Sequence, residues 1–344
     1  MYQIAIIGAS GFTGAELMRL CAMHTEFDVI AATGDTQAGS RVGDLYPSLA
    51  GVYGEMSYVP YDESIVADAD LVFLGLPHGA SQPVVPGLRG KVEHIVDLAS
   101  DFRLDDPGLY PAWYGDEHES PELLADFAYG LPELFRAGLS GAELVAVPGC
   151  YPTTAVLGLA PLLKAGLIEG SGIIVDAATG VSGAGRPPKP HTTFCSVDED
   201  FSAYGLLNHR HTPEMEMVLR QHSGIDAQLI FTPHLAPMNR GILATCYARP
   251  AGALTTEGAL ACLHEAYADE PFVVVSERSP STKATLGSNS CHITARVDER
   301  TGWVVVLAAL DNLVKGASGQ AVQCANLALG LPEDTGLAVA GVYP

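Results

Sequence analysis

One cysteine, Cys150, stands between a Pro-Gly turn and what the sequence AVPGCYPTTA predicts to be the start of a helix. The preceding strand is expected to end at Pro148, and Gly149 then turns the chain. A thiol in the first turn of a helix is favoured as the thiolate, because the helix dipole and the free N–H groups stabilise negative charge. Cys150 is therefore a candidate nucleophile. The alternative is the buried, inert thiol that most unpaired cysteines provide.

Segment 208–216, NHRHTPEME, offers a partner that could take the proton of such a thiol. His209 and His211 could serve as base and acid, and Glu214 could orient an imidazole. Arg210 adds a cation that could hold an anionic substrate. Two alternatives remain open: a solvated polar loop, or a metal site built on the two histidines, for which no third ligand with convincing spacing follows.

Two further arginines come after strand-like runs and could bind an anion. Arg103 ends DLASDFR (97–103), which follows an apolar run, and its guanidinium offers a bidentate fork to phosphate. Arg186 ends the glycine cluster GVSGAGR (180–186), whose small residues, Ser182 among them, would let a substrate lie against the backbone. A surface or salt-bridged arginine is the alternative for Arg103.

The N-terminal sequence YQIAIIGASGFTGAELMRLCAMH predicts a strand, a glycine turn and a helix. The turn places Gly8, Gly11 and Gly14 in a GxxGxxG pattern. Glycines let the backbone approach a pyrophosphate, and the start of the helix offers unpaired N–H groups to it. The pattern therefore predicts a dinucleotide site, although a tight turn without a ligand has the same residues.

The segment TGDTQAGSR (33–41) follows the next predicted strand, where the adenosine ribose of a bound dinucleotide would lie. Asp35 could bind both hydroxyls of an NAD ribose, whereas Ser40 and Arg41 could hold the 2′-phosphate of NADP. Asp35 could equally be a plain turn residue. These residues do not decide between the two cofactors.

Continuous apolar runs in the first half of the chain predict strands that are buried on both faces, and hence a parallel sheet with helices on either side. These runs lie at 28–33, 70–77, 94–99 and 143–148. An amphipathic helix is expected from Cys150 to near Gly166, and another with Thr212 as its N-cap and Pro213 as its first residue.

The last part of the chain predicts a strand at 303–310, a polar turn with Asp311, Asn312 and Lys315, and a helix from about 317 to 329. This helix is rich in Ala, Gly and Ser, which suits close packing onto the nucleotide-binding part. We therefore expect one domain built from 1–149 and 316–344, and a second, catalytic and oligomerisation domain from 150–315.

Composition limits the partners. The 344 residues contain 40 acidic and 18 basic side chains, a net charge of −22, which repels nucleic acids and anionic lipid surfaces. Apolar residues make up 48% and charged residues 17%, as in a well-buried globular protein. The seven cysteines show no CxxC and no regular spacing, and no apolar run approaches the ~20 residues of a membrane span. We expect reduced thiols, a cytoplasmic location and no membrane partner.

Several of these motifs agree in order and spacing with a known family. With GASGFTG, DLASDFR, VPGCYPTTA, GVSGAGR, HRHTPE, PHLAPMNRGI and DNLVKGASGQAVQ in sequence, the chain resembles, from end to end, the N-acetyl-γ-glutamyl-phosphate reductases of arginine biosynthesis. A wider kinship is to aspartate-semialdehyde dehydrogenase and phosphorylating glyceraldehyde-3-phosphate dehydrogenase. The resemblance implies an α/β fold with a Rossmann-like domain and an α+β catalytic domain that carries an antiparallel or mixed sheet.

The resemblance also implies a reaction: NADPH reduces N-acetyl-glutamyl 5-phosphate to the semialdehyde and phosphate is released. Cys150 would form a thioester, and His211, with His209 close behind, would be the acid/base. Arg103 would face the phosphate and Asn312 the nicotinamide. The cofactor diphosphate would contact the glycine turn at Gly8, Ser10, Gly11, Phe12, Thr13 and Gly14. A homodimer or homotetramer is implied, and Asp35 leaves NADH possible.

Rival functions can be ranked. The analogous amino-adipate reductase of lysine biosynthesis binds an acidic carrier protein, which a chain of charge −22 would repel. Aspartate-semialdehyde dehydrogenase does not share HRHTPE or the GVSGAGR pattern. A cysteine hydrolase would leave the GxxGxxG turn unexplained. A dinucleotide sensor without chemistry would not need both Cys150 and the HRH segment.

Overall fold

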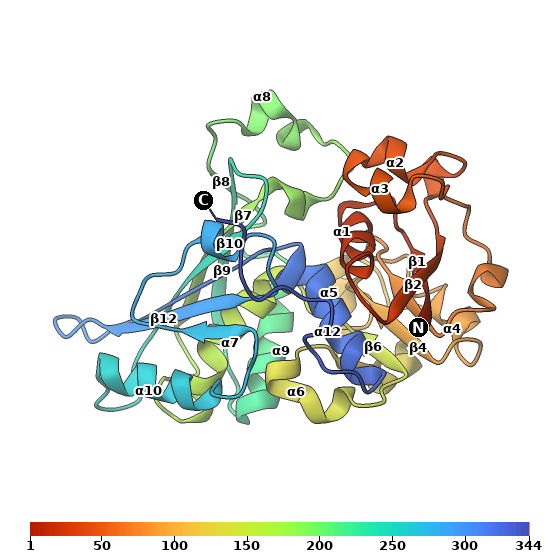
Figure 1. Ribbon diagram of the computed structural model, residues 1–344. Helices are drawn as coiled ribbons and strands as arrows, with labels where there is room; N and C mark the ends of the chain where they lie inside the picture. The colour runs from red at the N-terminus through yellow and green to blue at the C-terminus, as the bar shows by residue number, and fades with distance from the viewer. Residues whose placement is uncertain (344) are drawn as a thin grey trace. The chain divides into compact units, whose positions relative to one another are not determined.

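The computed structural model describes residues 1–343, and these form two compact units. Unit 1 combines Met1–Gly108, Asp116–Pro148 and Ala317–Leu337. Unit 2 combines Leu109–Gly115, Gly149–Gly316 and the residues from Ala338 on. Each unit has its own sheet (Figure 1). Every helix among the described residues is too short or too polar to cross a bilayer.

Unit 1 is built on a six-stranded parallel sheet in the order β2-β1-β3-β4-β6-β5. Its strands are β1 (Tyr2–Ile7), β2 (Phe27–Ala32), β3 (Leu71–Leu74), β4 (His94–Asp97), β5 (Ala128–Tyr129) and β6 (Leu144–Ala146). The chain leaves β1 toward β2 on one side and returns to β3 on the other, so the strand order reverses beside β1. Parallel sheets bind ligands at the carboxyl ends of the strands at such a point.

The strands of unit 1 are apolar because both faces of the sheet are covered. All four residues of β3 are buried, as are all three of β6. The predicted runs were correct in place, but three of the four were too long, since β3 stops at Leu74, β4 at Asp97 and β6 at Ala146. The run at 28–33 has the length of β2 and is shifted by one residue.

The helices of unit 1 are α1 (Phe12–Cys21), α2 (Val42–Leu45), α3 (Ala50–Tyr53), α4 (Val85–Leu88), α6 (Pro132–Leu139) and α12 (Gly319–Ala328). Helix α12 packs against α1, α6 and β4. Its buried Gln320 donates to the carbonyl oxygen of Gly130, and Asn326 donates to the carbonyls of Glu333 and Thr335. The small residues of α12 thus bring a late segment into the core of unit 1.

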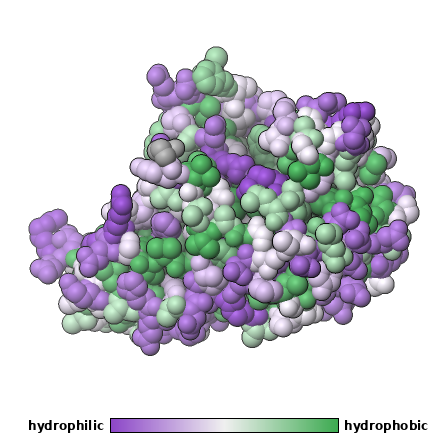
Figure 2. Space-filling model, viewed as in Figure 1, coloured by the Kyte–Doolittle hydropathy of each residue, from purple (hydrophilic) through white to green (hydrophobic). Residues whose placement is uncertain are grey.

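Unit 2 contains a seven-stranded mixed sheet in the order β11-β12-β13-β10-β7-β9-β8. Its strands are β7 (Ile173–Gly180), β8 (Ser202–Ala203), β9 (Leu229–Ala236), β10 (Ile242–Ala248), β11 (Val273–Val275), β12 (Cys291–Val297) and β13 (Val304–Leu310). The pairs β7/β9 and β11/β12 are parallel and the others antiparallel. The turn that joins β12 and β13, at the left of Figures 1 and 2, is hydrophilic, as its residues Asp298–Thr301 require.

The helices of unit 2 are α5 (Tyr110–Tyr114), α7 (Cys150–Lys164), α8 (Phe194–Val197), α9 (His211–Ser223), α10 (Thr256–Ala266) and α11 (Thr282–Thr285), with a π-helical turn at Val314–Ser318. Helix α7 was predicted to be amphipathic, which is wrong: its residues from Tyr151 to Leu163 are all buried. It lies against α9, α10, β10 and β13, so it has no solvent face.

Candidate active site

Cys150 is the first residue of α7, as the sequence predicted, and its side chain is partly exposed. Gly149, in extended conformation, is the N-cap residue. A second glycine gives the cysteine room, because a Cβ on Gly316 would lie 2.8 Å from the Cβ of Cys150. A thiol at the start of a 15-residue helix is placed where the helix dipole favours the thiolate.

His211 lies directly beside the N-cap of this helix. A Cβ on Gly149 would overlap the Nε2 atom of the His211 imidazole. Only glycine therefore allows the imidazole to come this close to the backbone that precedes Cys150. The structure thus brings together a thiol and an imidazole from two segments about sixty residues apart in the sequence.

Glu214 is fully buried one turn further along α9. Its Oε1 accepts a hydrogen bond of 2.8 Å from the N–H of Gly149. The sequence suggested that Glu214 orients an imidazole. The hydrogen bond to Gly149 ties α9 to the N-cap residue of the helix of Cys150, which fixes the separation between the two helix starts.

His209 sits in an aromatic cluster close to His211. The two imidazole centroids are 4.8 Å apart, and the rings of Tyr151, Tyr204 and Phe231 surround His209 at 5.2 to 5.8 Å. Burial, with the nearby charge of Arg210, lowers the pKa of His209 to about 4, so the ring is neutral at pH 7. Its Nδ1 accepts from the N–H of His211.

Two tyrosines of this cluster were missed by the sequence reasoning. The hydroxyl of Tyr204 donates to that of Tyr151 over 3.1 Å, and Tyr151 donates to the carbonyl of His234. Burial raises the pKa of Tyr204 to about 12, so it stays protonated. Tyr151 directly follows Cys150, which was a usable signal. Tyr204 lies in a segment without any recognisable pattern.

The start of α9 was predicted two residues too late. The helix begins at His211 with Arg210 as N-cap, whereas Thr212 had been assigned that position and Pro213 the first helical one. The reason is local: His209 uses its ring nitrogen and its carbonyl to accept from the N–H groups of His211 and Thr212. These contacts allow the helix to start earlier, and Pro213 is still within the first turn.

The predicted substrate ligands of unit 2 fall into different surroundings. Ser182 lies on a 3-10 turn after β7, and its hydroxyl accepts from the side-chain amide of Asn312. Asn312 is buried and also accepts from the N–H of Gly241. Arg186 is partly buried, and Arg210 is exposed with its guanidinium 5.9 Å from the ring centroid of Tyr114. A side-chain hydrogen bond therefore joins Ser182 to Asn312.

In unit 1, the glycine turn after β1 has the shape that a bound phosphate needs. Gly8 has φ +87°, and a Cβ on it would lie 2.5 Å from the carbonyl oxygen of Gly75, which follows β3. A Cβ on Gly14 would overlap Ala9. At Gly11 there is ordinary space. The two obligatory glycines thus bring the start of α1 against the ends of β1 and β3.

The other predicted cofactor residues follow this turn. Ser10 uses its carbonyl to accept from the hydroxyl of Tyr46, Phe12 is the first residue of α1, and the carbonyl of Thr13 accepts from the hydroxyl of Ser318. These contacts use backbone carbonyl groups. The N–H groups in the first turn of α1 are oriented toward the helix start, where an anion would bind.

The predicted ribose segment adjoins the glycine turn. A Cβ on Gly34 would lie 3.0 Å from the Cβ of Ser10. Asp35 is exposed on a 3-10 turn, while the hydroxyl of Ser40 donates to the carbonyl of Gln37. Arg41 is exposed. The segment therefore exposes one acidic side chain, Asp35, and one basic side chain, Arg41.

Arg103 belongs to unit 1, in the turn after β4, and its side chain is 8% exposed. Its Nη2 donates to the carbonyl of Leu98 over 2.7 Å. This buried position differs from the surface arginine that was the alternative reading.

The six other cysteines lie inside apolar or helical runs of the sequence, which predicts that each is a buried, inert thiol. Cys21, Cys246, Cys291 and Cys324 are buried, and burial raises the pKa of Cys21 and Cys246 to about 12. Cys195 contradicts the expectation, because it is exposed on the short helix α8, which packs its residues against no core.

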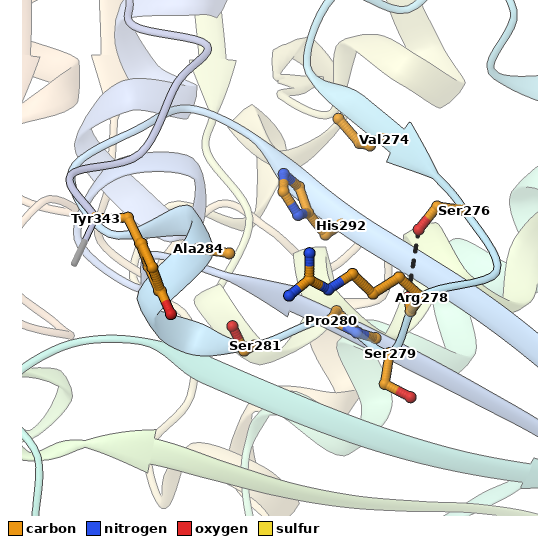
Figure 3. Close-up of a pocket in the computed structure, with 9 residues that line it drawn as sticks. All are labelled: Val274, Ser276, Arg278, Ser279, Pro280, Ser281, Ala284, His292 and Tyr343. Atoms are coloured by element: carbon orange, nitrogen blue, oxygen red, sulfur yellow. Dashed lines mark hydrogen bonds between the residues drawn. The ribbon is translucent and has the colours of Figure 1, made fainter.

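A cavity of about 400 Å³ lies elsewhere in unit 2, beside β11, β12 and α11 (Figure 3). The side chains of Arg278, His292 and Tyr343 line it, with three serines. None of the predicted site residues is among its lining residues.

Two family models and several curated proteins match this chain. The family model described as semialdehyde dehydrogenase, NAD binding domain, matches residues 3–142, and that described as semialdehyde dehydrogenase, dimerisation domain, matches residues 150–312. An N-acetyl-gamma-glutamyl-phosphate reductase of Geobacter sulfurreducens is 48% identical over the full length of both chains. One of Pelotomaculum thermopropionicum is 47% identical over 99% of each chain.

Solved structures agree on the fold. Aspartate semialdehyde dehydrogenase II from Vibrio cholerae, complexed with ASA, superposes with a TM-score of 0.70 at 16% identity, over 96% of this chain and 98% of that one. The enzyme from Candida albicans, solved with NADP, gives a TM-score of 0.68 at 14% identity, over 95% and 98%. These matches confirm the predicted α/β fold. The chain belongs to the semialdehyde dehydrogenase family, and within it to the N-acetyl-gamma-glutamyl-phosphate reductases.

Proposed function

We propose that this protein reduces N-acetyl-L-glutamyl 5-phosphate to N-acetyl-L-glutamate 5-semialdehyde, with release of phosphate, in arginine biosynthesis. The observation that carries the proposal is the position of the His211 imidazole against Gly149, at the start of the helix that Cys150 begins. Full-length relatives named for this reaction support it.

The proposed chemistry begins at the sulfur. The Cys150 thiolate attacks the acyl carbon, the C–O bond to phosphate breaks, and a thioester forms on Sγ. A bound reduced nicotinamide would supply the hydride that reduces the thioester carbon. The resulting thiohemiacetal loses the thiolate and becomes the aldehyde. A thioester suits this sequence because it separates the loss of phosphate from the reduction and accepts hydride more readily than a carboxylate.

We assign the acid/base role to His211 rather than to His209. His211 lies beside the residue that precedes Cys150, while burial and Arg210 hold His209 neutral inside a ring of aromatic side chains. The environment of His209 suits a residue that packs against its neighbours and accepts a hydrogen bond. Glu214 would act by holding Gly149 in place.

The cofactor residues fit a dinucleotide. The cradle formed by Gly8 and Gly14, where a Cβ would meet backbone atoms, leaves the surface that a diphosphate needs. We propose NADP(H) as the cofactor, with Ser40 and Arg41 at the 2′-phosphate. Asp35 on the same turn would favour NAD(H), so the preference is a direct test of this part. Arg103, Ser182, Arg186 and Arg210 remain our proposed substrate ligands, and Asn312 the nicotinamide contact.

We propose that the protein is a homodimer or homotetramer. The unit 2 sheet has helices α7, α9 and α10 against it, and alternate residues on its strands stay partly exposed. On β10 and β13 these are Leu243, Thr245, Tyr247, Val305 and Leu307. An apolar sheet face of this kind is a surface for a second copy, and the matched family model is named a dimerisation domain. Biosynthetic relatives and unpaired cysteines support a cytoplasmic location.

The test is a spectrophotometric assay with purified protein, in which NADPH and NADH are each offered with N-acetyl-glutamyl phosphate and with the amino-adipyl analogue. We expect oxidation of NADPH only with the first substrate. Oxidation with the analogue alone would favour the lysine route, and binding of cofactor without oxidation would favour a sensor. The names of the relatives do not favour either alternative.

A further inference from the structure

Two loops of unit 1 meet at the carboxyl ends of β3 and β4. These strands are parallel neighbours, with Leu74 opposite Asp97. The loop after β3 contains His78 and Ser81, and the turn after β4 runs from Asp97 to Arg103. The side chains of Asp97, Asp101 and Ser81 are all completely buried. Two carboxyl groups are therefore held out of water on one turn.

Ser81 stands between the two carboxyl groups. Its hydroxyl oxygen lies 2.9 Å from Oδ2 of Asp97 and 2.8 Å from Oδ2 of Asp101. A serine hydroxyl has one hydrogen and can donate to only one of these oxygens. If both carboxyl groups were ionised, one short contact would join two oxygens with no hydrogen between them. The geometry therefore requires a second proton, carried by one of the two aspartates.

The surroundings of the two groups show which of them carries it. Asp101 accepts from the N–H groups of Gly79 and Ser81 and contacts Nδ1 of His78 at 2.7 Å. Although burial raises its pKa, these contacts outweigh burial and lower the pKa to about 2. Asp97 accepts one backbone N–H, from Ala99, and burial raises its pKa to about 7. The proton belongs on Asp97.

We propose that Asp97 holds a proton in the folded protein and that Asp97, Ser81 and Asp101 form one directional hydrogen-bond chain that positions Arg103. Asp97 donates to Ser81, and Ser81 donates to Asp101. The chain fixes both ends of the turn, and Arg103 closes it by donating to the carbonyl of Leu98. Asp97 acts here as a positioning residue, and this rests on the proposed function, in which Arg103 binds the substrate phosphate.

The charges around this hydrogen-bond chain show how the proton on Asp97 affects Arg103. With Asp97 neutral, Asp101 is the anion of the hydrogen-bond chain, and His78 and His118 are the titratable groups that face it. Arg103 interacts electrostatically with Asp97. The neighbouring elements β3, β6 and α12 contain no charged residue. Loss of the proton would turn Asp97 into an anion that acts on Arg103, and this would weaken the attraction of Arg103 for a phosphate.

The pH dependence of the protein's folding stability tests for the proton on Asp97 without any substrate. In the unfolded chain Asp97 releases its proton near pH 4, and in the folded protein near pH 7. Because the folded state binds the extra proton between these values, this group's contribution to stability is lost as pH rises from about 4 to about 7. Asp97→Asn, whose amide can also donate to Ser81, lacks this loss.

We expect the difference in melting temperature between Asp97→Asn and the parent to change by several degrees in favour of Asp97→Asn from about pH 5 to about pH 8. Other titrating groups, His118 and His209 included, are present in both proteins and cancel. The matched control is Asp62→Asn, an exposed aspartate that also accepts from a serine, and it should run parallel to the parent. A constant difference for Asp97→Asn would overturn the proposal.

A second measurement covers the case in which Asp97→Asn does not fold. Infrared spectra of the unmodified protein should show a carboxylic-acid C=O band that disappears as pH passes about 7, and Ser81→Ala should shift that band as the acid loses its acceptor. The absence of such a band from the unmodified protein would also overturn the proposal.

The positioning of Arg103 is tested with anions. In the parent, KM for the acyl phosphate should rise severalfold from about pH 6 to about pH 8.5 with little change in kcat, and in Asp97→Asn it should stay flat. Sulfate, whose charge is constant over this range, should show the same contrast in binding affinity. Equal pH dependence of sulfate binding in the two proteins would refute the positioning role. A failure of the proposed function would stop turnover but leave the sulfate, melting and infrared results in place.

Discussion

Two glycines decide how closely the side chains around Cys150 approach one another. A Cβ on Gly149 would overlap the imidazole of His211, and one on Gly316 would crowd the Cβ of Cys150. The cysteine and the histidines were predictable from the sequence, because a helix start after a Pro-Gly turn and an HRH segment each have a chemical signature. The roles of Gly149 and Gly316 were not, because they depend on packing between distant segments.

At the residue scale, the assignment of the acid/base predicts unequal effects of two similar substitutions. His211→Asn should lower kcat by about 100-fold or more, the usual range for loss of a general acid/base. His209→Asn should cost less, since its neutral ring packs among aromatic side chains. Steady-state kinetics of both variants decide the matter, and a larger loss from His209→Asn would reverse the assignment.

At the scale of elements, most of the fold near the site followed from pattern. The apolar runs placed four strands of the unit 1 sheet, and Cys150 was correctly taken as the start of α7. The wrong predictions have different causes. The burial of α7 on all sides is set by tertiary neighbours, which local sequence does not contain. The early start of α9 at His211 is set by the local contacts of His209 with the first N–H groups of the helix, which the residue types alone did not indicate.

The junction of α7 and α9 predicts a sharp effect of one methyl group. Gly149→Ala would place a Cβ on Nε2 of His211, so the imidazole must move. We expect a loss of kcat of about 100-fold, the scale for displacement of a catalytic group by about 1 Å. Gly138→Ala, at a helical glycine with open space around its Cβ position, is the matched control. Near-normal turnover of Gly149→Ala would show that His211 need not stay there.

The aromatic cluster around His209 predicts acid sensitivity. His209 has a pKa of about 4 in the folded protein, against about 6.5 when unfolded. The unfolded chain therefore binds more protons between these values, and this contribution to stability, of order 1–3 kcal/mol, is lost as pH falls from about 6.5 to about 4. Denaturant unfolding of His209→Asn should show a weaker loss over this range than the parent, whereas the exposed His191→Asn should match the parent. Identical slopes for His209→Asn and the parent would contradict a buried neutral imidazole.

At the scale of the whole molecule, the net charge limits which partners the protein can bind, and the topology of the unit 2 sheet limits how much of the fold could be predicted. The net charge of −22 argues against polyanionic partners, and positive groups that bind an anionic substrate must then be local, as we propose for Arg103. The mixed sheet of unit 2 was predicted only through the family resemblance. Its strand order depends on pairings between segments far apart in the chain, which apolar runs do not specify.

The partly exposed face of that sheet predicts an assembly that one charge can disrupt. Leu307→Asp, in the middle of β13, should convert the dimer or tetramer into monomers, because an unpaired carboxylate buried at an interface costs several kcal/mol. Light scattering after gel filtration measures this. Arg300→Asp, in the exposed turn after β12, is the control and should keep the parental mass. A monomeric parent protein would refute the proposed assembly.

The most direct test of the account is to trap the acyl group on Cys150. The protein is mixed with N-acetyl-glutamyl phosphate without cofactor, and intact and peptide mass spectrometry are combined with a phosphate assay. We predict one acyl group per chain, on the peptide of Cys150, and a matching release of phosphate. Cys150→Ser should show neither this adduct nor turnover, whereas Cys195→Ser, at an exposed cysteine, should show both. Turnover of Cys150→Ser near the parental rate, or parental turnover with no adduct, would contradict covalent catalysis.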